Sequence, residues 1–385
     1  MVSRTPFGLI CLIWFAGLGA AAQYGKISVI YDQLPAVYPQ AGPALGFIVS
    51  LVGFVGIVFG VVAGLLVARV GYRRALIWAL WGGALLSLGQ AVLPPLPVLL
   101  ALRGLEGVSH LAIVVAAPTL IAHLSAPRHV GLTMTLWSTF FGVAYTVLVW
   151  GGLPLVMGFG LSSLFIAHAL WMAALALILG RALRGLPLRR SVEPMSLSTV
   201  LRDHKAIYRS ASISAPAMGW LFYTFCFLAI LTLIPPYLPD GVRAAVLGAM
   251  PLVSIAVSMT LGVVLLRYMS AVVEILLGFG LTVACLVWLL LDPGLPLACL
   301  ALAAALGLIQ GASFAAVPQL NARADTQAQA NGAMAQMGNV GNTLGTPILA
   351  AVLAVAGYGG MIGLAIFVFA LGGATHIWLA MRRRS

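Results

Sequence analysis

Long apolar blocks fill most of the chain, and short breaks containing Pro, Gly or charged residues separate them. A helix needs about 20 apolar residues to cross the hydrocarbon core of a bilayer, and most of the blocks have this length. The pattern therefore predicts twelve membrane-spanning helices. Their approximate ranges are 7–30, 44–67, 74–93, 97–121, 131–153, 162–183, 212–236, 243–266, 271–291, 296–318, 331–356 and 360–381.

Composition supports an all-α integral membrane protein. Hydrophobic residues make up 62% of the 385 positions and charged residues only 7%, whereas soluble domains carry roughly a quarter charged residues. Twelve spans and their loops use almost the whole length, so little remains for a soluble domain. The lipid bilayer is the first expected partner.

The net charge of +12 follows membrane orientation and does not indicate nucleic acid. All but three of the 20 Lys and Arg residues fall in segments that the twelve spans place on one side; the exceptions are Lys26, Arg103 and Arg243. Positive charge gathers on the cytoplasmic side of membrane proteins. We therefore expect both termini in the cytoplasm of a bacterium, with the chain as a multi-pass protein of the cytoplasmic (inner) membrane. No basic patch with interleaved aromatic residues indicates nucleic-acid binding.

The chain divides into two similar halves. A charged connection at 184–210 separates a predicted six-helix bundle at 1–183 from a second at 211–385. Positions recur between the halves: Gly64 and Arg69 as Gly262 and Arg267, Pro118 as Pro318, and Gly107 as Gly311. A duplication with the same orientation predicts two bundles related by an axis along the membrane normal, with a site between them near the midplane.

Three ionisable residues share one face of the predicted helix at 97–121. Arg103, Glu106 and His110 have offsets of three and seven, which lie close together around a helix. Ionisable side chains inside a membrane span are costly and mark functional sites by default. His110 is a candidate proton relay, and the alternative is a neutral, hydrogen-bonded packing residue.

Lys26 is a further charge inside a span. It precedes Asp32 by six residues, so it lies on the order of 10 Å below the outer surface, near the expected depth of Arg103. Three interpretations are open: an ion pair with Glu106, an anion site shared with Arg103, or a side chain that extends to the outer headgroups.

Uncharged polar and aromatic residues on other spans are candidates for the wall of a transport cavity. The alternative is that these side chains hydrogen-bond neighbouring helices together. The candidates are Gln23, Ser138, Tyr145, Trp220, Tyr223, Gln310, Ser313, Gln336, Asn339 and Thr343.

Two motifs resemble those of the major facilitator superfamily. Gly64, Arg69, Gly71 and Arg73 match the family's signature between helices 2 and 3, although Ala68 stands where the family usually has Asp. Arg103, Glu106 and Gly107 are similar to its helix 4 motif. The resemblance implies two six-helix bundles, alternating access, a cytoplasmic gate at the first motif and proton coupling at the second. Ala68 removes the acidic member of that gate, whose arginines can instead cap helix carboxyl ends.

These observations predict a proton-coupled secondary transporter for a small organic solute that is anionic or zwitterionic. The alternatives are efflux of drug-like compounds by proton antiport and a non-transporting membrane receptor or assembly factor. The helix 5 region lacks the Gly-Pro pair that is usual in the family's drug antiporters. No phosphate-binding loop, metal-ligand spacing or nucleophile motif is present, so we expect no cofactor, no metal and no enzymatic activity. We expect a monomer.

Overall fold

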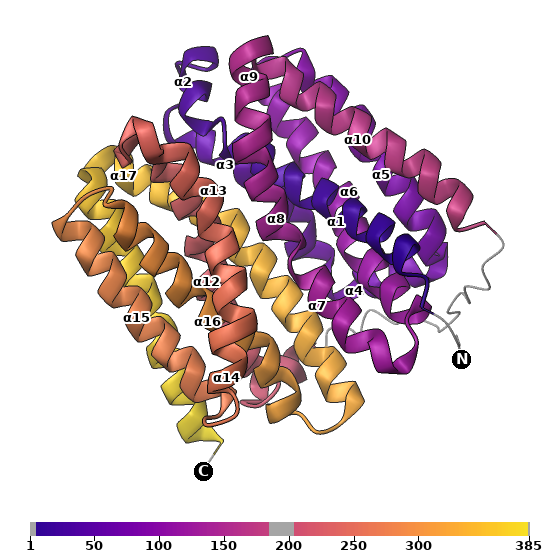
Figure 1. The fold of residues 1–385 in the computed structure, drawn as a ribbon, viewed down its shortest axis with the longest axis vertical. Coiled ribbons are helices and arrows are strands. Elements are labelled where there is room, and N and C mark those ends of the chain that lie inside the picture. The colour runs from indigo at the N-terminus through magenta and orange to yellow at the C-terminus, as the bar shows by residue number, and fades with distance from the viewer. Residues whose placement is uncertain (1–4, 185–203, 384–385) are drawn as a thin grey trace. The chain divides into compact units, whose positions relative to one another are not determined.

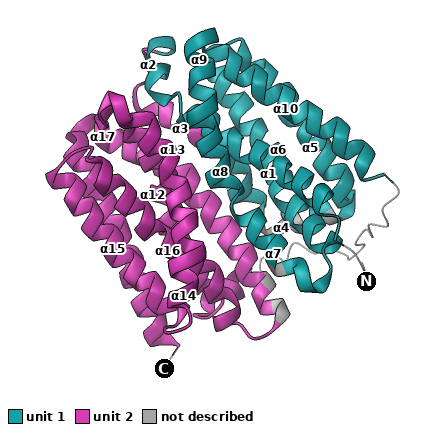
Figure 2. Ribbon diagram, viewed as in Figure 1, with its two compact units in different colours: residues 1–38, 51–195 teal, residues 39–50, 196–385 magenta. Residues whose placement is uncertain are grey.

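The computed structural model describes residues 5–184 and 204–383, without the side chains at positions 61, 62, 64, 65, 68, 131, 324, 325 and 328. Helices make up nearly all of this part of the chain, and no strand occurs in it (Figure 1). The chain forms two compact units (Figure 2). Unit 1 contains residues 1–38 and 51–195, and unit 2 contains residues 39–50 and 196–385.

Unit 1 is built on four long helices, α1, α5, α6 and α10. Its helices are α1 (Phe7–Ser28), α2 (Leu34–Val37), α4 (Phe54–Val70), α5 (Tyr72–Ala91), α6 (Leu96–Leu124), α7 (Val130–Ser138), α8 (Phe140–Val147), α9 (Leu153–Phe159) and α10 (Leu161–Ala182). Short 3-10 turns occur at Tyr31–Gln33, Leu51–Gly53 and Pro127–His129, and a π-helical turn joins α8 to α9 at Leu148–Gly152. Ile13, Leu80, Ile113, Leu120 and Met172 are buried in the core where the four long helices meet.

Besides a short helix at residues 204–209, unit 2 contains the remaining labelled helices. These are α3 (Leu45–Ser50), α12 (Ser214–Leu233), α13 (Asp240–Val257), α14 (Val263–Leu265), α15 (Ala271–Leu291), α16 (Pro296–Leu320) and α17 (Ala324–Arg382). Two 3-10 turns lie at Gly42–Ala44 and Pro235–Tyr237, and a π-helical turn at Ser258–Gly262 links α13 to α14. The stripe of Gly338, Gly341 and Gly345 on α17 lies directly against α12. A side chain at Gly338 would collide with Trp220, and one at Gly341 or Gly345 would collide with Thr224 or Phe225. Small residues let two helix backbones approach in this way.

Ten helical segments within residues 5–184 and 204–383 are long and apolar enough to cross a membrane. The difference from the predicted twelve has two causes. The segment α5 is not among the ten, because Arg73, Arg74 and Gln90 dilute its apolar residues. The predicted spans at 331–356 and 360–381 fall within one continuous segment, Gln329–Arg382. The count of twelve and the cytoplasmic termini therefore stay predictions.

Glycines with positive φ end or bend two of the long helices. Gly71, with φ 93° and ψ 127°, separates α4 from α5. Gly357, with φ 66° and ψ −168°, is the non-helical residue inside α17. Side chains strongly disfavour both conformations. Gly357 lies between the two predicted spans, so α17 consists of two helical stretches that meet at a kink at this residue.

The starts of two helices refine the internal repeat. Helix α6 begins at Leu96 and α16 at Pro296, and Pro118 and Pro318 lie inside them. The same spacing aligns Gly107 with Gly307. Each of these glycines lies against a carbonyl of a neighbouring element, that of Val52 or Ser254. This shared contact favours Gly307, rather than Gly311, as the counterpart of Gly107. The two-bundle division at 1–183 and 211–385 stays a prediction, and residues 185–203 of its linker lie outside the described residues.

Candidate functional site

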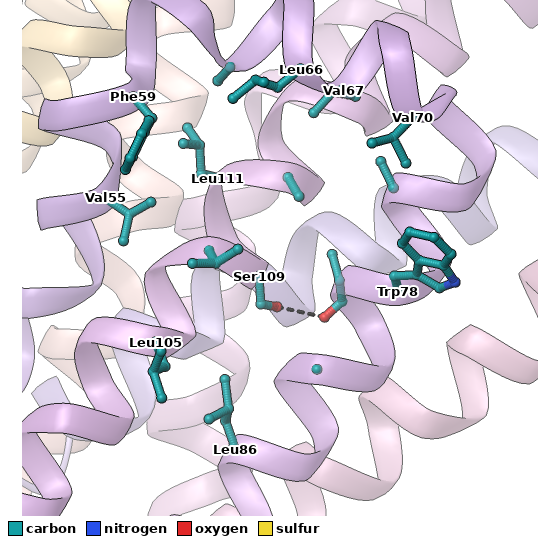
Figure 3. Close-up of a pocket in the computed structure, with 16 residues that line it drawn as sticks. Val55, Phe59, Leu66, Val67, Val70, Trp78, Leu86, Leu105, Ser109 and Leu111 are labelled. Carbon is teal, nitrogen blue, oxygen red and sulfur yellow. Dashed lines mark hydrogen bonds between the residues drawn. The ribbon is translucent and has the colours of Figure 1, made fainter.

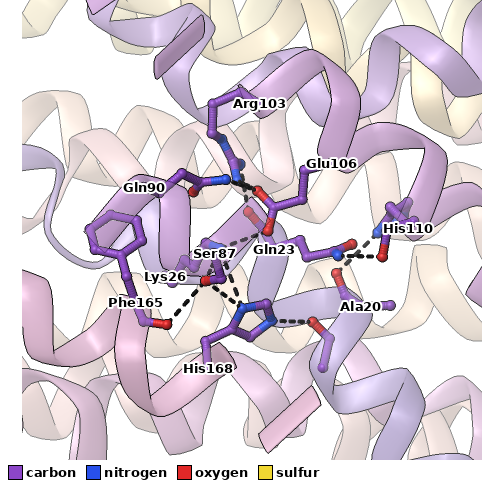
Figure 4. A network of polar contacts seen from close by, with 12 residues as sticks. Ala20, Gln23, Lys26, Ser87, Gln90, Arg103, Glu106, His110, Phe165 and His168 are labelled. Carbon is purple, nitrogen blue, oxygen red and sulfur yellow. Dashed lines mark hydrogen bonds and ion pairs between the residues drawn. The ribbon is translucent and has the colours of Figure 1, made fainter. Parts of the chain in front are cut away.

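A buried polar cluster occupies the interior of unit 1 (Figure 4). Helix α1 contributes Gln23 and Lys26, α5 contributes Ser87 and Gln90, α6 contributes Arg103 and Glu106, and α10 contributes His168. The side chains of these residues are all buried, and those of Lys26, Arg103 and Glu106 have 0% exposure. We call these seven residues the ionic cluster.

The ammonium of Lys26 has an acceptor for each of its three protons. Its Nζ lies 2.6 Å from Oε1 of Glu106, 2.9 Å from Oγ of Ser87 and 3.3 Å from Nδ1 of His168. The ring of Phe165 lies on a further side, with its centroid 5.4 Å from Nζ. One lysine on α1 therefore contacts α5, α6 and α10 together.

The second oxygen of Glu106 is held by two more donors. Nε2 of Gln90 donates to Oε2 at 2.7 Å, and Nη1 of Arg103 forms an ion pair with the same oxygen. Nη2 of Arg103 donates to the main-chain carbonyl of Gln23 at 2.5 Å. Two cations thus face one carboxylate, so with neutral histidines the ionic cluster has a net charge of +1. Charges enclosed in this way must be paired, because transfer from water costs several kcal/mol per ion.

The geometry distinguishes the three interpretations of Lys26. The ion pair with Glu106 is present. Extension of Lys26 to the outer headgroups is wrong for this structure, because the amine is enclosed and bonded inside unit 1. Lys26 and Arg103 do lie at one site, but their donors face protein groups, so a shared anion site stays a hypothesis for another conformation.

The two histidines have different surroundings. Nδ1 of His110 lies 3.0 Å from the carbonyl of Ala20, and its ring packs edge-on against Tyr24. His168, which the sequence analysis did not select, contacts Lys26 and Ser87 directly, and its Nε2 lies 3.0 Å from the carbonyl of Gly19. A histidine inside an apolar span was the available signal for it. Ser87 and Gln90, three residues apart on α5, were also missed.

The remaining candidates in unit 1 have separate positions. Gln23 belongs to the ionic cluster, where its Nε2 donates to Oγ of Ser109 at 2.9 Å. Ser138 donates to the carbonyl of Thr135 at the end of α7, and Tyr145 is buried on α8. Whether Ser138 and Tyr145 line a transport cavity stays a prediction.

In unit 2, three of the candidates meet. Trp220 and Tyr223 stack with centroids 4.7 Å apart, and the hydroxyl of Tyr223 donates to Oε1 of Gln310 at 3.4 Å. The others are dispersed. Ser313 and Asn339 donate to carbonyls of their own helices, Gln336 accepts from Tyr208, and Thr343 is buried on α17.

The first sequence motif lies at the junction of α4 and α5. Arg73 donates from Nη2 to the carbonyl of Gly180, near the carboxyl end of α10, at 2.9 Å. Arg69 is exposed at the end of α4, and Gly71 forms the break between the helices. The backbone of Gly64 lies within α4, while its surroundings fall outside the described residues. This contact caps a carbonyl near the carboxyl end of a helix. It is the arrangement that the sequence analysis considered for a gate in which Ala68 replaces the usual Asp.

An apolar groove of about 720 Å³ lies among α4, α5 and α6 (Figure 3). Phe59, Trp78 and Leu105 line it and are exposed. Ser109 is its polar member, and its hydroxyl donates to the carbonyl of Ala79 while accepting from Gln23. The groove therefore adjoins the ionic cluster through one serine. Within the described residues, no group of three or more His, Cys, Asp or Glu side chains is placed to hold a metal ion.

Comparisons with known proteins agree with this architecture. The chain is similar to the crystal structure of the human organic anion transporter MFSD10 (TETRAN), with a TM-score of 0.71 and 16% sequence identity over 97% of this chain and 100% of that chain. At this identity the likeness shows the fold. No curated protein matches the sequence. The profile of the Major Facilitator Superfamily matches residues 9–346, and the chain therefore belongs to that superfamily of membrane transporters.

Proposed function

We propose that this protein is a proton-coupled secondary transporter of a small organic anion that works by alternating access. The observation that carries the proposal is the ionic cluster, in which Lys26 and Arg103 enclose Glu106 inside a membrane-spanning unit. Ionisable groups are retained at such a depth where they bind ions or move protons. The proposed location is the bacterial cytoplasmic membrane.

Charge favours an anionic or zwitterionic substrate. The ionic cluster has one more cation than carboxylate, and the fold is shared with a protein described as an organic anion transporter. An anion that reaches the cluster in another conformation would balance the extra charge. Within unit 2, the neutral side chains Trp220, Tyr223 and Gln310 form a separate group of proposed solute contacts.

The proposed coupling step is a change in the charge of the ionic cluster. Lys26 connects α1 to Ser87 on α5, Glu106 on α6 and His168 on α10. Gain or loss of one proton changes these bonds and so changes the relative free energies of the inward-facing and outward-facing states. His110 stays a candidate relay at the edge of the cluster.

Reconstituted proteoliposomes with an imposed pH gradient test the proposal. The probe is radiolabelled p-aminohippurate, a small organic anion, and a luminal pH dye records proton movement. We expect the gradient to accelerate p-aminohippurate transport, and we expect Glu106→Gln to remove that acceleration. Glu274→Gln provides a matched control, because Glu274 is a buried carboxylate of unit 2 outside the ionic cluster. Gradient-driven transport that persists in Glu106→Gln would exclude a coupling role for Glu106.

Efflux of apolar, drug-like compounds is the second candidate, and the groove among α4, α5 and α6 favours it. Its walls are almost wholly apolar, and it opens at exposed residues such as Trp78. Expression in a strain that lacks its own pumps tests this activity with ethidium. Raised tolerance that Gly82→Leu removes would favour efflux through the groove, since a side chain at Gly82 meets open space and would fill it. Unchanged tolerance would favour the organic anion.

A further inference from the structure

We infer that Lys26, rather than Glu106, gives up and takes back the coupling proton. His168 is the group that accepts this proton from Lys26 as it leaves. The inference rests on the proposed proton coupling and names the groups that perform it. It depends on three features of the ionic cluster: its charge, the direction of its hydrogen bonds and the exposure of its members.

The charge balance selects Lys26. Arg103 keeps its proton under all ordinary conditions. Protonation of Glu106 would remove the negative charge that faces both Lys26 and Arg103, and Lys26, Arg103 and Gln90 all donate to its carboxylate. Loss of a proton from Lys26 instead leaves the neutral pair of Arg103 and Glu106. An enclosed neutral pair is much less costly than an enclosed net charge.

The other ionisable groups near Lys26 lie on α1, α6 and α10, and they are compatible with Lys26 as the group that releases the coupling proton. On α1 the other such group is Tyr24, whose ring packs against His110. Helix α6 presents Arg103, Glu106 and His110, and α10 presents His168. Helix α5 presents only the neutral Ser87 and Gln90 to the ionic cluster.

The hydrogen bonds of His168 identify it as the acceptor. The carbonyl of Gly19 can only accept, so Nε2 of His168, 3.0 Å away, carries the ring proton. Nδ1 of the neutral ring therefore has a free lone pair, and Nζ of Lys26 lies 3.3 Å from it. The hydroxyl of Ser87 has two acceptors within reach, the carbonyl of Phe165 at 3.1 Å and Nδ1 of His168 at 2.9 Å. When it donates to Phe165 and its oxygen accepts from Lys26, Nδ1 is left to accept from Lys26.

The transfer step is balanced within this contact. One N–H bond of Lys26 breaks, and a new N–H bond forms at Nδ1 of His168. Lys26 becomes a neutral amine and His168 an imidazolium, whose Nδ1 proton faces Oγ of Ser87 at 2.9 Å. His168 has 5% exposure, whereas Lys26 and Glu106 have 0%. In the proposed step the proton therefore passes from a group with no exposure to one with slight exposure.

The consequence for the helices is specific. As an ammonium, Lys26 holds α1 to three other helices, and as an amine it loses its ion pair with Glu106. The bonds of Glu106 to Arg103 and Gln90 remain, as does that of Arg103 to the carbonyl of Gln23. Deprotonation thus loosens the contacts of one side chain of α1 while α5 and α6 stay connected.

Nitrogen NMR of the whole protein in nanodiscs tests the inference. Lys26 and Lys205 are the only lysines in the chain, so Lys205→Arg leaves one ¹⁵Nζ signal, which distinguishes ammonium from amine. We expect this signal to convert as the pH is raised through the range in which p-aminohippurate transport changes. His168→Gln keeps an acceptor and a donor but cannot carry the proton, and we expect it to slow proton exchange at Lys26 by about a hundredfold.

The wild-type protein supplies a second readout that does not depend on folding of the variant. While Lys26 is an ammonium, Nδ1 of His168, identified by its contact with Lys26, must give the signal of an unprotonated nitrogen. A protonated Nδ1 in that state would overturn the inference. So would a Lys26 signal that stays ammonium wherever transport changes, and in that case loss of coupling in Glu106→Gln would still support the proposed function. Conversion of Lys26 without any proton movement in proteoliposomes would support the exchange and exclude the coupling.

Discussion

The ammonium of Lys26 and the carboxylate of Glu106, 80 residues apart in the chain, lie 2.6 Å from each other with both side chains fully enclosed. The pair joins α1 to α6, and neither partner can reach water in this arrangement. Its two members are not equivalent: within the described residues Glu106 forms ion pairs with both Lys26 and Arg103, whereas Lys26 forms one with Glu106 alone.

This asymmetry predicts unequal effects on stability. Lys26→Met leaves Arg103 and Glu106 as a neutral pair, whereas Glu106→Gln leaves two enclosed cations. Removal of one partner of a buried ion pair costs about 3–5 kcal/mol. We expect Glu106→Gln to lower the free energy of unfolding by an amount in this range and Lys26→Met to lower it by clearly less. Thermal unfolding in detergent measures both, with Asp240→Asn at the surface as control; equal losses would contradict the charge balance described above.

The sequence located part of the ionic cluster and could not locate the rest. Helical periodicity alone places Arg103 and Glu106 on one face of α6, and the depth of Lys26 in its span suggests the pair. Ser87, Gln90 and His168 are single, uncharged polar residues in apolar spans, and the pairing of α5 and α10 with α1 leaves no trace in the periodicity of any one helix. These residues become neighbours only through the tertiary packing of α1, α5, α6 and α10.

The fold shows a similar division. Apolar block length predicts α15 at its observed bounds and α6 within a few residues. Block length does not predict that residues 39–50 belong to unit 2, because that placement depends on the packing of α3 against α17, where Gly46 lies on the backbone of Pro347. Close contacts of this kind depend on neighbours distant in sequence.

Gly107 should be sensitive to any side chain. A Cβ at Gly107 would collide with the carbonyl of Val52, whereas a Cβ at Gly104, on the same helix, meets nothing within 4 Å. We expect Gly107→Ala to destabilise the protein by about 1–3 kcal/mol, the usual cost of overpacking. Gly104→Ala should be neutral or stabilising by up to about 1 kcal/mol, because alanine favours helix. Thermal unfolding of the two variants side by side measures the difference. Similar unfolding free energies would show that α6 does not depend on the close approach of Gly107 to the carbonyl of Val52.

Gly357 should be required for the bend in α17. Its φ of 66° and ψ of −168° are essentially restricted to glycine, and a side chain there costs on the order of 1–3 kcal/mol. We expect Gly357→Ala to destabilise the protein by this amount. Gly363→Ala is the matched control, since Gly363 also lies in α17 and a Cβ added there would meet nothing within 4 Å. A Gly357→Ala variant as stable as Gly363→Ala would mean that α17 can straighten at this position.

A comparison of Arg73 with Arg74 distinguishes capping of a helix carbonyl from the effect of positive charge alone at the junction of α4 and α5. Both are adjacent arginines of the first turn of α5, but Arg73 donates to the carbonyl of Gly180 while Arg74 is exposed. The two substitutions Arg73→Gln and Arg74→Gln remove the same charge, so their effect on membrane orientation is the same. We expect Arg73→Gln to lower the free energy of unfolding by about 0.5–1.5 kcal/mol, the net value of one hydrogen bond, and Arg74→Gln to leave it nearly unchanged.

If the bond from Arg73 to the carbonyl of Gly180 also holds the proposed cytoplasmic gate closed, Arg73→Gln alone will change the rate of p-aminohippurate transport in proteoliposomes. Equal transport rates and equal unfolding temperatures in the two variants would show that both arginines act only through their positive charge beside the membrane.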